Sequence, residues 1–198
     1  MERHASIERN TGETQISLTL DLDGNGTYDI QTDIRFLNHL LQLFAGHGLF
    51  DLSLKTKGDL VDDHHLVEDI AICLGQAIRE ALGEKKGICR YGSIVLPMDD
   101  VLCLAAVDLS GRPLFRTNYS PIHEKVNDLS TEMVPHFFRS LTVSGAMNLH
   151  LQFILAGENE HHRIEAAFKA FAHALRQACE PDRRTQGVPS TKGTLSWK

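Results

Sequence analysis

Two short runs of residues in this chain have the types and the spacing of metal ligands. They are His64-His65-Leu66-Val67-Glu68 and His161-His162-Arg163-Ile164-Glu165, and both read H-H-x-x-E. Each run opens a stretch of apolar residues with the period of a helix. On a helix, residues i and i+4 share one face, so His64 and Glu68 can approach one ion. His65, turned by about 100°, faces elsewhere, and one helix can therefore serve two sites.

The repeat extends beyond these two runs. His39 lies 25 residues before His64, and His136 lies 25 residues before His161, so corresponding residues are offset by 97. A single H-H-x-x-E run is more often just the polar first turn of a helix, with Glu favoured by the helix dipole and His exposed. Two copies in matched register indicate an internal duplication, and they favour metal ligands over that simpler interpretation.

The duplication selects six imidazoles and two carboxylates. The candidate metal ligands are His39, His64, His65, Glu68, His136, His161, His162 and Glu165. They divide into two sites of three imidazoles and one carboxylate, each of which leaves positions open on a six-coordinate ion, as catalysis requires. Imidazole also suits Zn, Ni, Co and Fe, so the ligand types alone leave the metal open.

Composition narrows the class of protein. The chain has 198 residues and a net charge of −6 without a long run of one sign, which argues against a nucleic-acid or membrane-binding face. Its four cysteines form no C-x-x-C pair and are expected to be reduced and mostly buried. The N-terminus has no apolar signal region, and no apolar run approaches about 18 residues. We therefore expect a cytoplasmic protein.

The elements that must position the ligands can be read in order. Alternating residues predict strands over 4–9, 13–22, 28–32 and 50–56, with Asp23–Gly26 as a hairpin turn between the second and the third. The run from Asp21 also imitates the start of a calcium-binding loop, but its flanks alternate like strands, which argues against calcium. Apolar periodicity predicts helices over 36–45 and from His64 to about Leu82.

The second half repeats this plan. Strands are predicted over 92–96, 101–108, 114–118 and 148–155, and helices over 131–143 and from His161 to about Cys179. The result is an α+β fold of two βββαβα halves, about 1–86 and 87–183. Because each half is small for a core of its own, we expect both to pack as a single domain, residues 1–198.

The C-terminal tail, 184–198, carries Ser190, Thr191 and Lys192 between two glycines. Hydroxyl and ammonium donors on a turn are suited to binding a phosphate. Composition alone also fits a solvated tail, and favours it.

Several of these motifs together resemble the imidazoleglycerol-phosphate dehydratase family, the lyases of histidine biosynthesis. The resemblance covers nearly the whole chain and is carried by 36–41, Gly46-His47-Gly48, 62–69, Pro97-Met98-Asp99, 136–141, 161–170 and 187–193. It implies two Mn²⁺ per active site on the eight residues selected above. It also implies a duplicated fold like the second domain of ribosomal protein S5, and a homo-oligomer of 24 chains with active sites at subunit interfaces.

The resemblance also assigns roles to residues outside the ligand set. Glu13 and His47 would be catalytic, with Glu13 at the reacting carbons and His47 assisting at the hydroxyl. The substrate would be bound by Glu13, His39, His47, Arg90, Arg112, Lys169, Ser190, Thr191 and Lys192. Of these, Arg90, Arg112, Lys169, Ser190 and Lys192 would cradle its phosphate. The chain departs from the family pattern at Asn38, where Asp is expected, and at Leu66, where Thr is expected. Neither change removes a ligand.

The implied reaction removes water from D-erythro-imidazoleglycerol phosphate to give imidazoleacetol phosphate. The proton to be lost is not next to a carbonyl, so the imidazole ring must accept the electrons. Two metal ions on the ring nitrogens would favour an imidazolate, which could expel hydroxide through a diazafulvene-like intermediate while Glu13 shuttles protons.

Two other interpretations stay open at this point. One is a di-metal hydrolase, although such sites usually contain more bridging carboxylates. The other is a structural metal site.

Overall fold

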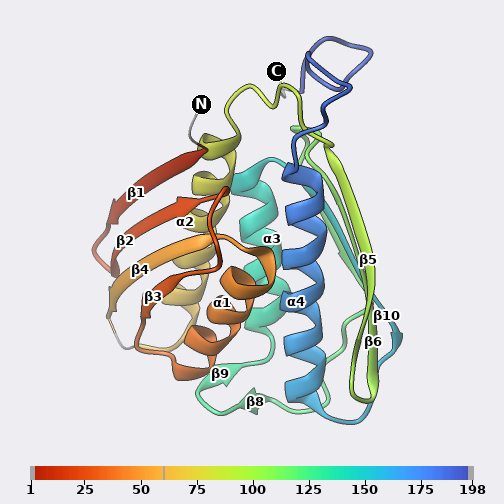
Figure 1. Cartoon of the computed structure of the whole chain (residues 1–198). Helices are drawn as coiled ribbons and strands as arrows, with labels where there is room; N and C mark the ends of the chain where they lie inside the picture. The colour runs from red at the N-terminus through yellow and green to blue at the C-terminus, as the bar shows by residue number, and fades with distance from the viewer. Residues whose placement is uncertain (1–2, 60, 196–198) are drawn as a thin grey trace.

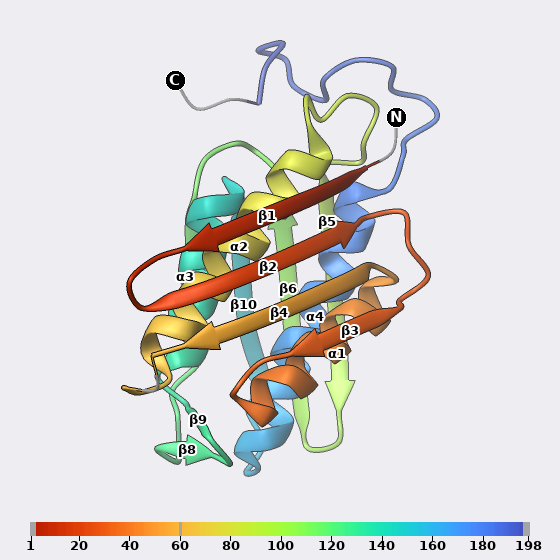
Figure 2. The same cartoon turned by 90° about the vertical axis from the view of Figure 1, so that its left-hand side faces the viewer.

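The computed structural model describes residues 3–59 and 61–195 of the chain. In this part of the chain, two four-stranded sheets enclose a layer of four helices (Figures 1 and 2). The elements in chain order are β1 (His4–Asn10), β2 (Thr14–Asp21), β3 (Tyr28–Gln31), α1 (Arg35–Gly48), β4 (Asp51–Gly58), α2 (His64–Leu82), β5 (Tyr91–Met98), β6 (Val101–Asp108), β7 (Leu114–Thr117), β8 (Lys125–Val126), β9 (Leu129–Ser130), α3 (Met133–Gly145), β10 (Asn148–Leu155) and α4 (Glu160–Cys179).

The two sheets have the same topology, which confirms the predicted duplication and the α+β class. The strand orders are β1-β2-β4-β3 and β5-β6-β10-β7. In each sheet the strand before the ligand helix lies in the interior, antiparallel to one neighbour and parallel to the other. Each half is therefore a βββαβα unit, as predicted.

The predicted hairpin between β2 and β3 is wrong, because β4 lies between these strands. The connecting loop instead crosses the start of β4. There the Asp51 carboxylate accepts hydrogen bonds from the backbone N–H groups of Asn25 and Thr27, both at 2.8 Å. Gly24 is needed at this crossing, since a Cβ would lie 2.4 Å from the Asp51 nitrogen. These contacts replace those that a tight turn would make with an adjacent strand.

Each helix is covered on two faces, one by the sheet of its own half and the other by a helix of the other half. Helix α1 packs on α4, and α2 packs on α3, so each contact joins one half to the other. Helices α2 and α3 approach at backbone distance: a Cβ at Gly75 would lie 2.5 Å from the carbonyl oxygen of Leu141. The buried apolar side chains form one continuous core that spans both halves. None of the helices in residues 3–59 and 61–195 is long and apolar enough to cross a membrane.

The second half contains an inserted hairpin, β8–β9, that was not predicted from the sequence. The connection from β3 to α1 covers residues 32–34, whereas the connection from β7 to α3 covers 118–132 and contains this hairpin. The 97-residue offset therefore holds for β4 and β10 (residue 51 to residue 148). For β1 and β5 it is 87 (residue 4 to residue 91).

The inserted hairpin holds the first-half helices at their N-terminal ends. The Asp128 carboxylate accepts hydrogen bonds from the backbone N–H groups of Arg35, at 2.8 Å, and Phe36, at 3.0 Å, and so caps α1. Ile34, at the N-cap position itself, offers no side-chain acceptor. The backbone N–H of Ser130 donates to Asp63, just before α2, at 2.5 Å.

Candidate metal centre

One candidate metal cluster lies where α1 meets α4. It consists of His39 from α1 with His161 and Glu165 from α4, whose ligand atoms all lie within 4.8 Å of one another. Glu165 Oε1 lies 2.5 Å from His39 Nε2 and 2.9 Å from His161 Nε2. His161 and Glu165 share a face of α4, as their spacing of four predicts.

A second cluster has the corresponding composition where α2 meets α3. It consists of His64 and Glu68 from α2 with His136 from α3. The Glu68 carboxylate lies 3.1 Å from His136 Nε2 and 3.9 Å from His64 Nε2. Each cluster thus takes two ligands from one half of the chain and one from the other. The crossed packing of the helices is what brings them together.

The donors in both clusters fit a divalent cation. His136 Nε2 is buried and makes no hydrogen bond to any described residue, although Glu68 lies beside it. Its lone pair is therefore uncommitted and available to an ion shared with His64 and Glu68. Two imidazoles and one carboxylate suit a first-row transition metal, and three protein ligands leave positions open for a further ligand or a substrate.

The two clusters differ in their surroundings. Glu165 is almost fully buried, and Lys169 Nζ donates a hydrogen bond to its second oxygen at 2.7 Å. Burial opposes ionisation of this carboxyl, but the hydrogen bonds from His39, Lys169 and His161 outweigh it and lower the pKa of Glu165 to about 2. At the position of Lys169, 97 residues earlier, the second cluster has Ile72. Glu68 is accordingly more exposed and has no ammonium beside it in the described residues.

His65 and His162 lie outside both clusters. His65 Nδ1 is 2.9 Å from the carboxylate of Asp59, and His162 Nδ1 is 2.8 Å from that of Asp100. The hydrogen bond to Asp59 raises the pKa of His65. A carboxylate on Nδ1 orients the ring and leaves Nε2 as the ligand atom, an arrangement found at many metal-bound histidines.

Asp59 and Asp100 were not predicted from the sequence. The 97-residue repeat matches neither carboxylate, since residue 156 is alanine and the turn after β5 that carries Asp100 follows the 87-residue offset instead. The signal that pointed nearest to them was the Pro97-Met98-Asp99 motif, which directly precedes Asp100.

The predicted catalytic residues lie near the clusters without joining them. Glu13 is exposed on the β1–β2 turn, with Oε1 3.7 Å from His65 Nε2. Its turn is held by Thr14, whose hydroxyl donates to the buried Asp69 of α2 at 2.5 Å. His47 lies near the C-terminal end of α1, with its ring 5.4 Å from that of His173. Burial, reinforced by the charge of Lys169, lowers the pKa of His47.

Of the predicted phosphate residues, Lys169 lies with the metal ligands and Arg90 lies with the tail. The Arg90 guanidinium pairs with Asp108 at 2.8 Å and donates to the Pro189 carbonyl at 2.8 Å. Its backbone N–H donates to Ala178, at the end of α4. Helix α4 rises about 1.5 Å per residue, so this anchor lies about 25 Å from His161 along the helix.

Arg112 and the tail residues complete the predicted phosphate set. Arg112 is exposed on the turn between β6 and β7, and Thr191 and Lys192 are exposed in the tail, where the Lys192 N–H donates to Ser190 Oγ at 3.2 Å. The tail leaves the end of α4 that is far from β8 and β9 (Figure 1). Residues 196–198 of the predicted tail lie outside the described part of the chain. Within one chain, the tail and the metal clusters are therefore at opposite ends.

The fold and the clusters define a class: a duplicated α+β protein in which two His/Glu clusters, each able to hold a metal ion, join the two halves. The sequence profile of imidazoleglycerol-phosphate dehydratase matches residues 32–175. The imidazoleglycerol-phosphate dehydratase of Lachnoclostridium phytofermentans is 54% identical over 98% of this chain and 100% of its own length. That of Acetivibrio thermocellus is 51% identical with the same coverage.

Solved structures agree with the sequence comparison. The imidazoleglycerol-phosphate dehydratase of Staphylococcus aureus has a TM-score of 0.82 and 38% identity, covering 90% of this chain and 99% of that one. That of Pyrococcus furiosus has a TM-score of 0.82 and 34% identity, covering 95% and 99%. The chain belongs to the imidazoleglycerol-phosphate dehydratase family. It is a dehydratase, a hydro-lyase of histidine biosynthesis that acts on a small molecule.

Proposed function

We propose that the chain dehydrates D-erythro-imidazoleglycerol phosphate to imidazoleacetol phosphate with two Mn²⁺ per active site. The observation that carries the metal assignment is the pair of clusters, each with two imidazoles, one carboxylate and open coordination positions. Two ions suit a substrate whose imidazole ring has two nitrogens. When bound, the ions supply the positive charge that makes this ring easier to deprotonate.

The protein's own residues hold the substrate and move its protons. Glu13 is an exposed carboxylate on a turn anchored to α2, and it can accept the proton from the carbon chain and return it. Lys169 adds positive charge beside the His39 cluster and can turn toward a phosphate. Burial lowers the pKa of His47 and so favours its neutral imidazole, which can accept a hydrogen bond from a substrate hydroxyl.

We further propose that the active site is completed between chains, in a homo-oligomer of 24 copies. His65 and His162 lie outside the cluster of their own helix, and the Nε2 of each would be the third imidazole, and the fourth protein ligand, of an ion on a neighbouring chain. The tail and Arg90 lie about 25 Å from His161 by helix rise, too far to share one small substrate within a chain. The tail of a neighbouring chain would instead contact the phosphate of a substrate that is bound at this chain's metal ions. We keep the cytoplasmic location as a prediction, in keeping with free Cys73, Cys89, Cys103 and Cys179.

Turnover by chelator-stripped protein tests this proposal. We expect imidazoleacetol phosphate to form when Mn²⁺ is restored and not without it, with about two ions bound per chain by direct metal analysis. Glu13→Gln should bind both ions and lose most of its turnover, whereas Glu8→Gln, a carboxylate on β1, should behave as the parent. Full turnover by metal-free, assembled protein would reject the manganese proposal. Full turnover by Glu13→Gln would remove Glu13 from the mechanism.

A further inference from the structure

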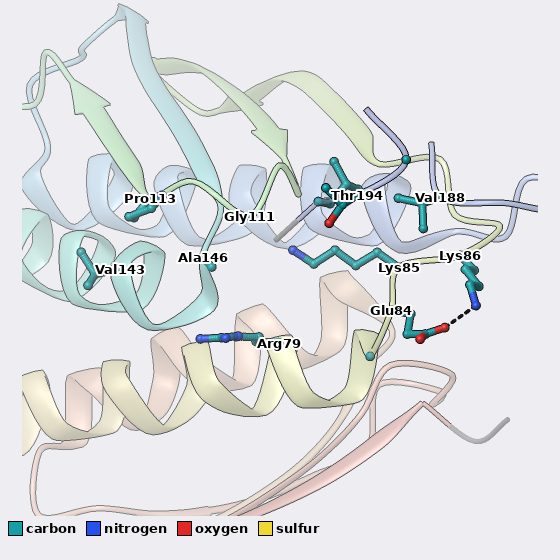
Figure 3. Close-up of a pocket in the computed structure, with 13 residues that line it drawn as sticks. Arg79, Glu84, Lys85, Lys86, Gly111, Pro113, Val143, Ala146, Val188 and Thr194 are labelled. Atoms are coloured by element: carbon teal, nitrogen blue, oxygen red, sulfur yellow. Dashed lines mark ion pairs between the residues drawn. The ribbon is translucent and has the colours of Figure 1, made fainter. Parts of the chain in front are cut away.

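A large pocket lies at the seam between the halves, outside the candidate metal centre. Its volume is about 940 Å³, and its walls come from the C-terminal end of α2, the residues after it, the β6–β7 turn, the α3–β10 turn and the tail (Figure 3). This size lies within the range of small-molecule sites. None of the eight candidate metal ligands lines the pocket, and neither do Glu13 and His47.

Two cationic side chains in this pocket have no carboxylate partner in the described residues. Lys85 is 6% exposed, and its ammonium donates one hydrogen bond, to the Leu109 carbonyl at 3.1 Å, which leaves two N–H groups. The Arg79 guanidinium makes no hydrogen bond or ion pair within residues 3–59 and 61–195. Figure 3 shows both side chains extending toward the same space, near Gly111 and Ala146.

The nearby carboxylates are already engaged. Glu84 pairs with Lys86, as the dashed line in Figure 3 marks, and Asp108 pairs with Arg90. Burial and the neighbouring charge of Arg79 lower the pKa of Lys85, and Asp108 compensates only in part. The pocket therefore has excess positive charge that an anion would neutralise.

We propose that this pocket binds a small organic anion, with its carboxylate or phosphate between Lys85 and Arg79. Its apolar part would lie against the aliphatic walls that Pro113, Val143 and Val188 provide. Charge-assisted hydrogen bonds from an ammonium and a guanidinium are the strong kind, and the guanidinium can bind in a bidentate way. The ligand class is an aliphatic carboxylate or a phosphate ester.

Occupancy of the pocket acts on the tail. Val188 and residues 193–195 form one wall and flank Ser190, Thr191 and Lys192 on both sides. A ligand held against this wall fixes the position of the tail and so changes the substrate KM without changing kcat. This coupling rests on the proposed function, because it requires the tail to contact the substrate phosphate; binding itself does not.

Calorimetric titration of the metal-stripped assembly with succinate and with inorganic phosphate tests binding. We expect one site per chain, weakened about tenfold in Arg79→Gln, which removes one charge-assisted contact from an exposed residue. Lys86→Gln, whose cation is paired with Glu84, is the matched control and should bind as the parent. Lys192→Ala should also keep this site, which separates it from the predicted substrate phosphate contacts. Unchanged binding by Arg79→Gln, or loss of all binding in Lys192→Ala, would overturn the proposal.

Steady-state kinetics test the coupling separately. Saturating succinate should change the substrate KM of the parent several-fold and leave the KM of Arg79→Gln unchanged. An equal response in both proteins would refute the coupling. If no protein turns over the substrate but succinate still binds in a way that depends on Arg79, the proposed function is refuted and the anion-binding role of the pocket stands.

Discussion

The Asp128 cap on α1 can be tested by Asp128→Ala. The carboxylate accepts two backbone hydrogen bonds at 2.8 and 3.0 Å, at the positive end of the helix dipole, and Ile34 offers no replacement. Loss of a capping side chain costs about 0.5–2 kcal/mol, and the two bonds to a charged acceptor place this one at about 1–2 kcal/mol. For a chain of 198 residues, that corresponds to a fall in Tm of about 3–6 °C.

The measurement is thermal unfolding of the metal-free protein at a fixed chain concentration, since assembly makes Tm depend on concentration. The Tm of Asp128→Asn, which keeps one acceptor oxygen, should fall by less than that of Asp128→Ala. Glu124→Ala removes an exposed carboxylate from the residue just before the same hairpin and should stay within about 1 °C of the parent. In a Mn²⁺ titration, Asp128→Ala should weaken the site that contains His39 more than the other. If Asp128→Ala and Glu124→Ala both unfold at the Tm of the parent, the Asp128 cap does not stabilise α1 and this reasoning fails.

Three further predictions follow from packing, charge and burial. Gly75→Ala places a Cβ 2.5 Å from the Leu141 carbonyl oxygen, so the free energy of unfolding should fall by about 1–3 kcal/mol. An unchanged midpoint of denaturant unfolding would contradict the close contact between α2 and α3. The Lys169 ammonium competes with a metal ion for the Glu165 carboxylate. Lys169→Met should therefore bind Mn²⁺ more tightly at one of the two sites in a titration, and weaker binding would contradict this competition. A thiol reagent near pH 8 should quickly modify only the exposed Cys89 in each folded chain, because burial raises the pKa of the other three thiols. If two or more thiols react quickly, the other cysteines are not buried as described. The slow cysteines are Cys73, Cys103 and Cys179.

The sequence predicted the helices and most strands because those signals are local. The period of apolar residues located the four helices of the described residues, and alternation located the long strands. The topology error at β3 has a long-range cause: the loop is held by Asp51, which lies 26 residues beyond Asn25. The β8–β9 hairpin has two-residue strands, too short to show alternation, and its main contacts, from Asp128 to α1, span 92 and 93 residues.

The candidate site was predictable to a similar extent. A fixed offset selected the ligand residues, and the i, i+4 rule paired His64 with Glu68 and His161 with Glu165. Which helix contributes the third ligand depends on how α1 and α3 pack across the seam, which no local pattern encodes. The inclusion of His65 and His162 among the metal ligands stays a prediction, since each projects from its helix in another direction.

The exchange of ligands between halves gives the duplication a functional meaning. Neither half holds a complete cluster: α1 supplies His39 to the second half, and α3 supplies His136 to the first. Two identical halves related by a two-fold axis would make this same reciprocal contact, as in a symmetric dimer. Joining them in one chain allowed the two clusters to diverge. One cluster has Lys169 and the Asp128 cap on its α1 helix, whereas the other has Ile72 at the position that corresponds to Lys169 and a more exposed Glu68. The two clusters should therefore differ in affinity for the same metal, which a symmetric dimer of halves could not achieve.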